Sequence, residues 1–251
     1  MKITGKQDLK SIKQEYSPQV NFTDKTYLML CGGTGCRSTG STEVKQALEE
    51  EIGAKCPEKD VRIVETGCNG FCAKGPILVV QPEDTFYQKL TPGDIPELVQ
   101  QHLVEEDYLT RHLFKDPSSK EIIAKQNQIP FFSHQLSRAL RNKGIIDPES
   151  IEHYIARDGY RAAASALLEM SSSDVMNEVK ISGLRGLGGA GFPTHKKWQF
   201  TADAEGTQKY VLCNADEGDP GAFMDRSILE ADPHAVIEGM IIAAAAIGAS
   251  K

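Results

Sequence analysis

The segment TYLMLCGGTGC, residues 26–36, decides the fold of the first part of the chain, because an apolar run leads directly into a pair of cysteines. The β-branched and aromatic character of residues 26–30 predicts a strand. A second segment, VRIVETGCNGFC at residues 61–72, repeats this arrangement and leads into Cys68 and Cys72. Two such strands place both cysteine pairs on loops at the same end of one sheet.

The two pairs have the spacings Cys31-x4-Cys36 and Cys68-x3-Cys72, and both loops are rich in glycine. Small residues let the backbone approach an inorganic cluster, and their N–H groups can donate hydrogen bonds to sulfur. A structural zinc site prefers cysteines two residues apart, and disulfides prefer oxidising compartments. The pattern therefore favours an inorganic cluster held by four cysteines, with zinc and disulfides as the alternatives.

The residues around the two cysteine pairs alternate between helical and strand patterns. Val44, Leu48 and Ile52 fall on one face of a helix predicted at residues 41–53, which ends at a glycine. Further predicted elements are strands at 76–80 and 85–90 and a helix at 94–103, with Asp94 as its N-cap. The order predicts a compact α/β unit over residues 25–105.

The motifs CGGTGC and ETGCNGFCAKGP in this order of elements resemble the thioredoxin-like 2Fe–2S ferredoxin domain. The resemblance covers roughly residues 25–105. It implies that four cysteines hold a 2Fe–2S cluster: Cys31, Cys36, Cys68 and Cys72. The other two cysteines, Cys56 and Cys213, are predicted to be bystanders, with Cys213 buried at the end of a strand.

The rest of the chain divides around this unit. Residues 1–24 are predicted to be a polar lead-in, and residues 106–146 a linker that drapes over a neighbouring surface, with a short helix at 135–144. Residues 147–251 are predicted to begin an α/β domain. Its expected elements are three helices between 147 and 183, a strand at 209–213 and a helix that starts at Asp232 and Pro233. The first of the three helices is predicted to be capped by Asp147 and the third by Ser172 or Ser173. An apolar helix after a strand normally returns to another strand, so we expect the natural protein to continue past Lys251.

Gly186, Gly188 and Gly191 match the spacing G-x-G-x-x-G of dinucleotide-binding turns. A Rossmann turn needs a strand before the first glycine and a helix after the last. Here a helical segment precedes the glycines, and Phe192 and Pro193 follow them. The context argues against a Rossmann turn, and the glycines followed by lysines favour a phosphate-binding nest.

The segments GLRGLGGAGFPTHKKW and KYVLCNADEGDPGAFMDRSILEADPHAVIEGM together resemble the flavoprotein subunit of NADH dehydrogenase modules. That family includes subunits of complex I, soluble hydrogenases and formate dehydrogenases. The resemblance implies an α/β domain that binds FMN, with NAD(H) or NADP(H) stacked on the flavin. It places the FMN and nucleotide site at Gly186, Gly188, Gly189, Ala190 and Gly191. By the same resemblance, Phe192 would stack on the dinucleotide and Lys197 would contact the FMN phosphate. Asn214, Asp216 and Glu217 would hold the flavin, and Asp219 would lie near the nicotinamide. No catalytic acid or base is assigned.

This chain departs from the family pattern at three places. Leu187 stands where the family usually has Arg, which removes a cation beside an anionic cofactor. His195 replaces a glycine, and Asp219 is one methylene shorter than the usual Glu. These changes could alter the choice between NADH and NADPH or weaken flavin binding.

A ferredoxin domain fused ahead of the flavoprotein domain is similar to the diaphorase subunits of NAD(P)-dependent, often electron-bifurcating, iron hydrogenases and related transhydrogenases. The resemblance implies an enzyme subunit that passes electrons between NAD(P)(H), FMN and iron–sulfur clusters. Its partners would be other iron–sulfur subunits of a hydrogenase-like or formate-dehydrogenase-like complex, with ferredoxin as a further candidate. A 4Fe–4S cluster is expected only on a part beyond this sequence. The alternative is a 2Fe–2S relay or docking subunit with a truncated flavin domain.

The bulk properties of the 251 residues agree with a globular protein, since 40% are hydrophobic and 25% charged, with a formal net charge of −7. No basic stripe indicates a nucleic-acid partner. The N-terminus lacks an apolar signal region, which predicts a cytoplasmic protein. The most apolar run, Ala235–Ala249, is too short to predict a membrane span.

Overall fold

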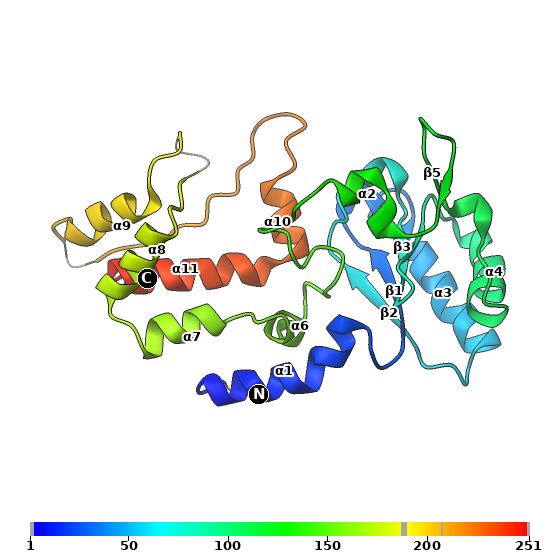
Figure 1. The fold of residues 1–251 in the computed structure, drawn as a ribbon, viewed down its shortest axis with the longest axis horizontal. Coiled ribbons are helices and arrows are strands. Elements are labelled where there is room, and N and C mark those ends of the chain that lie inside the picture. The colour runs from blue at the N-terminus through cyan, green and yellow to red at the C-terminus, as the bar shows by residue number, and fades with distance from the viewer. Residues whose placement is uncertain (1–2, 187–189, 207, 250–251) are drawn as a thin grey trace.

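The computed structural model describes residues 3–186, 190–206 and 208–249. It has a half built on a β-sheet and a half built of helices, which lie side by side (Figure 1). The first half contains the predicted α/β unit, with its strands and helices in the predicted order.

The sheet has four strands in the order β2-β1-β3-β4. Their bounds are Thr26–Cys31 for β1, Val61–Thr66 for β2, Leu78–Gln81 for β3 and Thr85–Tyr87 for β4. Strands β1 and β2 are parallel, with Cys31 opposite Thr66, and the other pairs are antiparallel. Because parallel strands end at the same edge, the loops that carry the two cysteine pairs start next to one another.

The two faces of β1 contact different parts of the chain, because successive side chains point to opposite sides of a strand. Leu28 and Leu30 pack on one face with α3 (Ser41–Lys55) and α4 (Ile95–Leu98), which continues as a π-helix at Val99–Val104. Tyr27, Met29 and Cys31 pack on the other face.

Residues 106–146, the predicted linker, cover that second face. They contain a small hairpin of β5 (Phe114–Lys115) and β6 (Ile122–Ile123) and the short helix α5 (Pro130–Ser133). Phe114 and Ile129 are buried against the sheet. The backbone N–H of Phe86 in β4 also donates to Ala124 O at 2.8 Å. The segment therefore supplies a layer of the domain and covers an edge that would otherwise be open to pairing.

The helical half is larger than the sequence predicted, because the N-terminal lead-in belongs to it. Helix α1 (Lys6–Asn21) packs against α6 (Ile151–Ala156), and Leu9 and Ile12 share a cluster with Ile155. The remaining helices are α7 (Arg161–Leu168), α8 (Ser172–Ile181), α9 (Thr194–Asp203), α10 (Asp225–Ala231) and α11 (Pro233–Ile247). The predicted start of the last helix at Asp232 and Pro233 is confirmed, and the Asp232 carboxylate caps α11 by accepting from Ala235 N at 3.2 Å.

The predicted strand at residues 209–213 is wrong. These residues have no regular structure, and the Leu212 side chain is 87% exposed. A strand needs a neighbour with free backbone groups, and the sheet order gives these residues none. Cys213, predicted to be buried at the end of that strand, is exposed for the same reason.

The predicted helix starts also shift. Asp94 stands at the N-cap position of α4, as predicted, but its side chain does not cap that helix: it closes a capping box with Thr91 on the preceding 3-10 turn, Pro92–Asp94. Ser150 caps α6 in place of Asp147, and Ser171 caps α8 in place of the next two serines. Residues 135–144 form turns and bends where a short helix was predicted. In each helix the nearest side chain that reaches the N3 amide decides the start.

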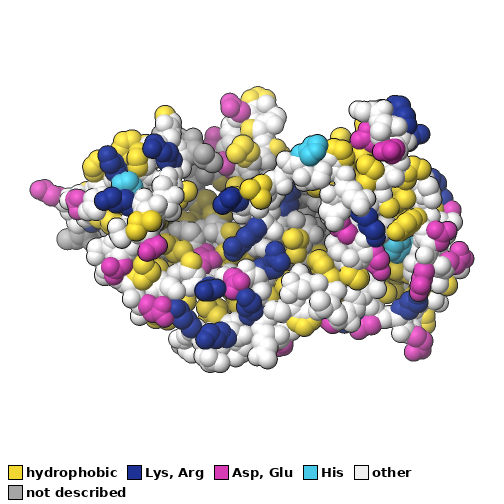
Figure 2. Space-filling model, in the orientation of Figure 1, with side chains coloured by type: hydrophobic (Ala, Val, Ile, Leu, Met, Phe, Trp, Pro, Cys, Tyr) yellow, Lys and Arg dark blue, Asp and Glu magenta, His cyan; other side chains and the backbone are white. Residues whose placement is uncertain are grey.

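Lys and Arg side chains gather over the helical half of the face shown in Figure 2. Several belong to ion pairs: Lys6 contacts Glu169, and Lys13 lies 2.7 Å from Asp158. The cations are thus offset by carboxylates, in agreement with the absence of a basic stripe in the sequence. Among the described residues, no helix combines the length and the apolar character that a bilayer crossing requires.

Candidate functional site

The four cysteines of the two loops come together at the end of β1 and β2. Cys31, Cys36 and Cys68 are buried, and Cys72 is exposed. The Cys68 and Cys72 sulfurs are 4.0 Å apart. A Cβ atom built on Gly33 would lie 2.7 Å from the Cβ atom of Cys68, so the first loop passes the second at a distance that only glycine permits.

Backbone groups of the second loop point toward the sulfurs. Asn69 N lies 3.4 Å from the Cys31 sulfur, and Gly70 N lies 3.3 Å from the Cys68 sulfur. Such N–H groups stabilise thiolates and cluster sulfides and help to set a cluster's potential. The donor set and its cradle therefore fit an iron–sulfur cluster.

The thiols also contact one another. A hydrogen bond with Cys36 raises the pKa of Cys31 to about 12, and the same bond lowers the pKa of Cys36. A hydrogen bond with Cys31, together with burial, raises the pKa of Cys68. In the described part of the chain, no group of three His, Cys, Asp or Glu side chains is arranged so that it could hold a single metal ion. The thiols instead form a row from Cys36 through Cys31 and Cys68 to Cys72, and binding a cluster would release their protons.

Residues of the linker hold the second cysteine loop. The Phe71 ring, between Cys68 and Cys72, stacks on Phe131 with 4.3 Å between centroids. Gln126 Nε2 donates to Asn69 Oδ1 at 3.3 Å, and Asn69 is buried. Lys143 lies against Gly70; burial raises the pKa of Cys72, and the charge of Lys143 opposes part of that rise. Gln126, Phe131 and Lys143 could not be identified from the sequence, because they are distant along the chain from the cysteine loop that they contact.

Helix α10 of the helical half contacts both cysteine loops. The Thr34 hydroxyl, between Cys31 and Cys36, donates to Glu230 Oε1 at 2.6 Å. On the second loop, a Cβ atom on Gly67 would lie 2.2 Å from Ala231 Cα, so that loop lies directly on the backbone of α10. These contacts join the two halves at the loops that carry the cysteines.

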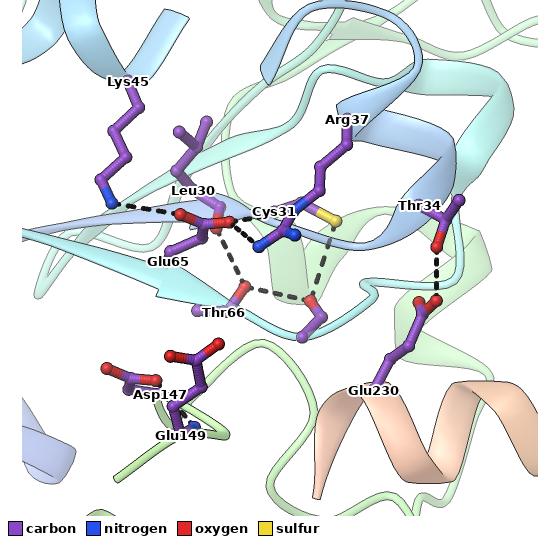
Figure 3. A network of polar contacts seen from close by, with 11 residues as sticks. Leu30, Cys31, Thr34, Arg37, Lys45, Glu65, Thr66, Asp147, Glu149 and Glu230 are labelled. Atoms are coloured by element: carbon purple, nitrogen blue, oxygen red, sulfur yellow. Dashed lines mark hydrogen bonds and ion pairs between the residues drawn. The ribbon is translucent and has the colours of Figure 1, made fainter. Parts of the chain in front are cut away.

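A cavity of about 420 Å³ lies beside these contacts. Figure 3 shows Arg37 and Lys45 converging on Glu65 at one side, with Thr34 and Glu230 joined at the other. Burial alone would raise the pKa of Glu65, but hydrogen bonds from Arg37 and Lys45 outweigh it and lower the pKa. Asp147 and Glu149 line the cavity opposite Glu65.

The glycine loop is a closed turn between α8 and α9. Gly186 N donates to Phe192 O at 3.0 Å, and Gly191 N donates to Gly186 O at 3.0 Å. Ala190 and Gly191 have positive φ angles of 50° and 73°. No strand precedes the loop within residues 172–186, so the predicted absence of a Rossmann turn is confirmed there. Leu187, Gly188 and Gly189 lie outside the described residues.

Two cations lie at this loop. A Cβ atom on Gly186 would be 2.5 Å from Lys197 Nζ, which places the ammonium of α9 against the loop backbone. Arg185 donates to Gly191 O at 3.0 Å, a contact that the sequence reasoning missed although the residue adjoins the motif. Phe192 is 41% exposed and tilts toward Phe200, with 6.3 Å between centroids. The described part of the loop thus presents two cations and an aromatic ring, while the N–H groups of Gly186 and Gly191 are engaged within the turn.

The acidic loop runs from residue 208 to α10. Asn214, Asp216 and Asp219 are exposed. Glu217 is engaged with the protein itself, because its carboxylate accepts from Asp225 N at 2.8 Å, from Arg226 N at 3.0 Å and from Met224 N. These bonds, the one from Arg226 first, lower the pKa of Glu217. Among described residues, no hydrogen bond joins the acidic loop to the glycine loop.

Family comparisons match both parts of the chain. Residues 19–103 match the thioredoxin-like [2Fe-2S] ferredoxin family, and residues 179–251 match the Nuo51 FMN-binding domain. The chain joins these two domains. The fold predicted for residues 25–105 is therefore confirmed, as is the relation of the C-terminal part to FMN-binding flavoproteins.

Two curated relatives are named as hydrogenase subunits. The NADP-reducing hydrogenase subunit HndC of Solidesulfovibrio fructosivorans is 56% identical over 117 residues, which are 47% of this chain and 24% of the relative. The NAD-reducing hydrogenase HoxS subunit alpha of Cupriavidus necator is 32% identical over 236 residues, which are 90% of this chain and 36% of the relative. The two-domain chain thus spans about a quarter to a third of their length.

Among solved structures, the thioredoxin-like [2Fe-2S] ferredoxin of Aquifex aeolicus is 29% identical. The match covers 38% of this chain and all of that ferredoxin, with a TM-score of 0.34.

Proposed function

We propose that the chain is the electron-transfer part of a subunit of an NAD(P)H oxidoreductase. In this proposal Cys31, Cys36, Cys68 and Cys72 hold a 2Fe–2S cluster. The observation that carries it is the meeting of two cysteine loops at the ends of parallel strands, with backbone N–H groups directed at the sulfurs.

We assign the flavin site to the loops of the helical half. The ammonium of Lys197, which lies against the backbone of Gly186, suits the FMN phosphate. Phe192, which is partly exposed, can stack on the dinucleotide. Asp216 and Asp219 are exposed and can accept from the flavin and the nicotinamide nucleotide, and Asn214, whose Oδ1 accepts from Asp216 N at 3.1 Å, can donate to them. The carboxylate of Glu217 shapes the loop by holding α10, and its contact with the flavin would add to that role.

When bound, FMN exchanges two electrons with a nicotinamide and single electrons with iron–sulfur clusters. The residues of this chain then bind and orient, and hydride transfer requires no catalytic acid or base from them. We propose other iron–sulfur subunits and ferredoxin as partners, by analogy with the hydrogenase relatives. We also propose a cytoplasmic location, because all six cysteines are free and cluster ligation needs reduced thiols.

A 2Fe–2S relay without flavin chemistry is the second candidate. The observation that favours it is that residues 208–218 have no regular structure and that the Glu217 carboxylate is already occupied. The two candidates differ in one measurable property, which is whether the chain binds FMN.

The test uses protein purified without oxygen, with assays of iron, acid-labile sulfide and released FMN. We expect two iron and two sulfide per chain, following the stoichiometry of a 2Fe–2S cluster, together with bound FMN. A cluster without FMN would support the relay, and zinc without iron would contradict both candidates.

Two matched pairs of variants assign the sites. Cys72→Ala should abolish the cluster spectrum, whereas Cys213→Ala, also at an exposed cysteine, should leave it unchanged. Lys197→Ala should weaken FMN binding about tenfold, the loss of roughly one charge-assisted hydrogen bond. Lys180→Ala, an exposed lysine of α8, should not.

A further inference from the structure

Glu230 lies where the helical half touches the first cysteine loop. Its carboxylate accepts from the Thr34 hydroxyl at 2.6 Å and from Arg226 Nε at 2.8 Å. Thr34 is the third residue after Cys31 and the second before Cys36, so this carboxylate is fixed to the middle of a predicted cluster-binding loop.

The geometry keeps Glu230 charged and largely shielded from water. Its side chain is 23% exposed, and its Oε2 atom is buried without a hydrogen-bond partner among the described residues. Burial would raise the pKa of Glu230, but the hydrogen bonds from Thr34 and Arg226 outweigh burial and lower it. A carboxylate in this position acts on nearby charge more strongly than one in water.

Helix α10 has little freedom to move the carboxylate away. At its C-terminal end, Ala231 lies against Gly67, which adjoins Cys68. At its N-terminal end, Glu217 accepts from the backbone N–H groups of three successive residues. The helix is thereby fixed to both cysteine loops and to the acidic loop.

We propose that Glu230 is a positioning residue for the first cysteine loop and that its charge lowers the reduction potential of the cluster held there. The proposal rests on the proposed function, since it requires the 2Fe–2S cluster. Addition of an electron makes a cluster more negative, so a fixed carboxylate nearby opposes reduction, and a fixed guanidinium favours it. The pKa of Arg226, the partner of Glu230, is raised first by its hydrogen bond with Glu230 and further by the charges of Cys68 and Cys72 nearby. The two members of this ion pair should therefore act on the potential with opposite signs.

The experiment is a redox titration of the full chain, with the reduced cluster followed by electron paramagnetic resonance. Glu230→Gln keeps an oxygen that can accept from Thr34 and removes the charge, so the midpoint potential should rise. Arg226→Gln should lower it. The matched control is Glu149→Gln. Glu149 lines the same cavity, but among the described residues its carboxylate makes no hydrogen bond to a cysteine loop. This control should change the potential less than Glu230→Gln or Arg226→Gln.

A second pair of variants separates position from charge. Thr34→Val removes the donor and should change the resonance line shape, because the loop loses its contact with α10. Thr34→Ser restores the hydroxyl and should restore the wild-type signal. Equal potentials in wild type, Glu230→Gln and Arg226→Gln, with the cluster intact, would overturn the inference and leave the proposed function standing. Protein without a 2Fe–2S signal in any variant, wild type included, would overturn both.

Discussion

The ring of Phe71 lies parallel to that of Phe131, with 4.3 Å between centroids and 8° between planes. One ring is in the loop between two predicted cluster ligands, and the other is in the segment that follows the sheet domain. Phe132 meets Phe71 edge-on, and Phe86 and Phe114 complete the group. The aromatic contact makes the linker a structural part of the cysteine site.

Phe131→Ala should loosen this attachment. Aromatic pairs contribute about 1 kcal/mol beyond the burial of their area, so the free energy of unfolding should fall by at least that amount. Urea unfolding followed by circular dichroism measures the loss, and limited proteolysis should cut the linker sooner. The matched control is Leu136→Ala, because that side chain is 80% exposed in the same segment. Equal effects of the two variants would show that the stacking carries no stability.

Glu238→Ala should be among the most destabilising single changes in the helical half. The Glu238 carboxylate is buried and accepts from the Tyr154 hydroxyl, from Tyr160 N at 2.9 Å and from Ala163 N at 3.0 Å. The alanine variant leaves all three donors without a partner, which costs about 3 kcal/mol or more.

Glu238→Gln keeps an acceptor and should lose less. Glu178→Ala, at an exposed position of α8, should change the free energy of unfolding by less than about 0.5 kcal/mol. A loss in Glu238→Ala no larger than in Glu178→Ala would contradict the assigned role.

Asp94 should make stability depend on pH in acid. Burial would raise its pKa, but hydrogen bonds from Thr91, Arg111 and His112 outweigh burial and hold the pKa well below the usual range of a carboxyl group. A depressed folded-state pKa adds stability that is complete above the unfolded pKa and is lost as the pH falls below about 4. Asp94→Asn should therefore unfold at lower urea concentration than wild type at pH 7.

The difference between wild type and Asp94→Asn should shrink as the pH is lowered through 4. Asp60→Asn is the control, because Asp60 pairs with Lys25 on the surface and such pairs contribute little. A wild-type advantage over Asp94→Asn that is as large at pH 2 as at pH 7 would show that the carboxylate's charge is not the cause.

Glu217→Ala should release the first turn of α10. The backbone N–H groups of residues 224–226 would lose their acceptor and exchange faster with deuterium. Asp219→Ala removes a neighbouring carboxylate that does not contact those groups, so exchange there should stay at the wild-type rate.

Much of the sheet half could be predicted from the sequence because its signals are local. The apolar run at residues 26–31 and the one at 61–66 each lead into cysteines, and the structure pairs them in parallel. The cysteine set followed from spacing and glycine content. The glycine loop could be separated from a Rossmann turn because the helix before it is visible in the sequence.

The features that were missed depend on contacts distant along the chain. Tyr210 and Leu212 look like part of a strand, but a strand forms only beside a partner, and both are exposed. Glu230 and Thr34 are 196 residues apart, and nothing in either neighbourhood of the sequence indicates their hydrogen bond. Glu217 was assigned to the flavin because its loop resembles the flavin-binding loop of the flavoprotein subunits. In the structure its carboxylate accepts from the backbone N–H groups at the start of α10.

Helix α1 precedes the sheet domain in the sequence but packs on α6, which follows it. The sheet domain therefore leaves the helical half at one point and returns to it at another. A module attached by a single tether can rotate widely about that tether, whereas one anchored at both ends keeps nearly one orientation. The rate of electron exchange between two bound groups falls steeply with their separation. In the proposed function, attachment at two points would therefore hold the two groups at a nearly constant distance.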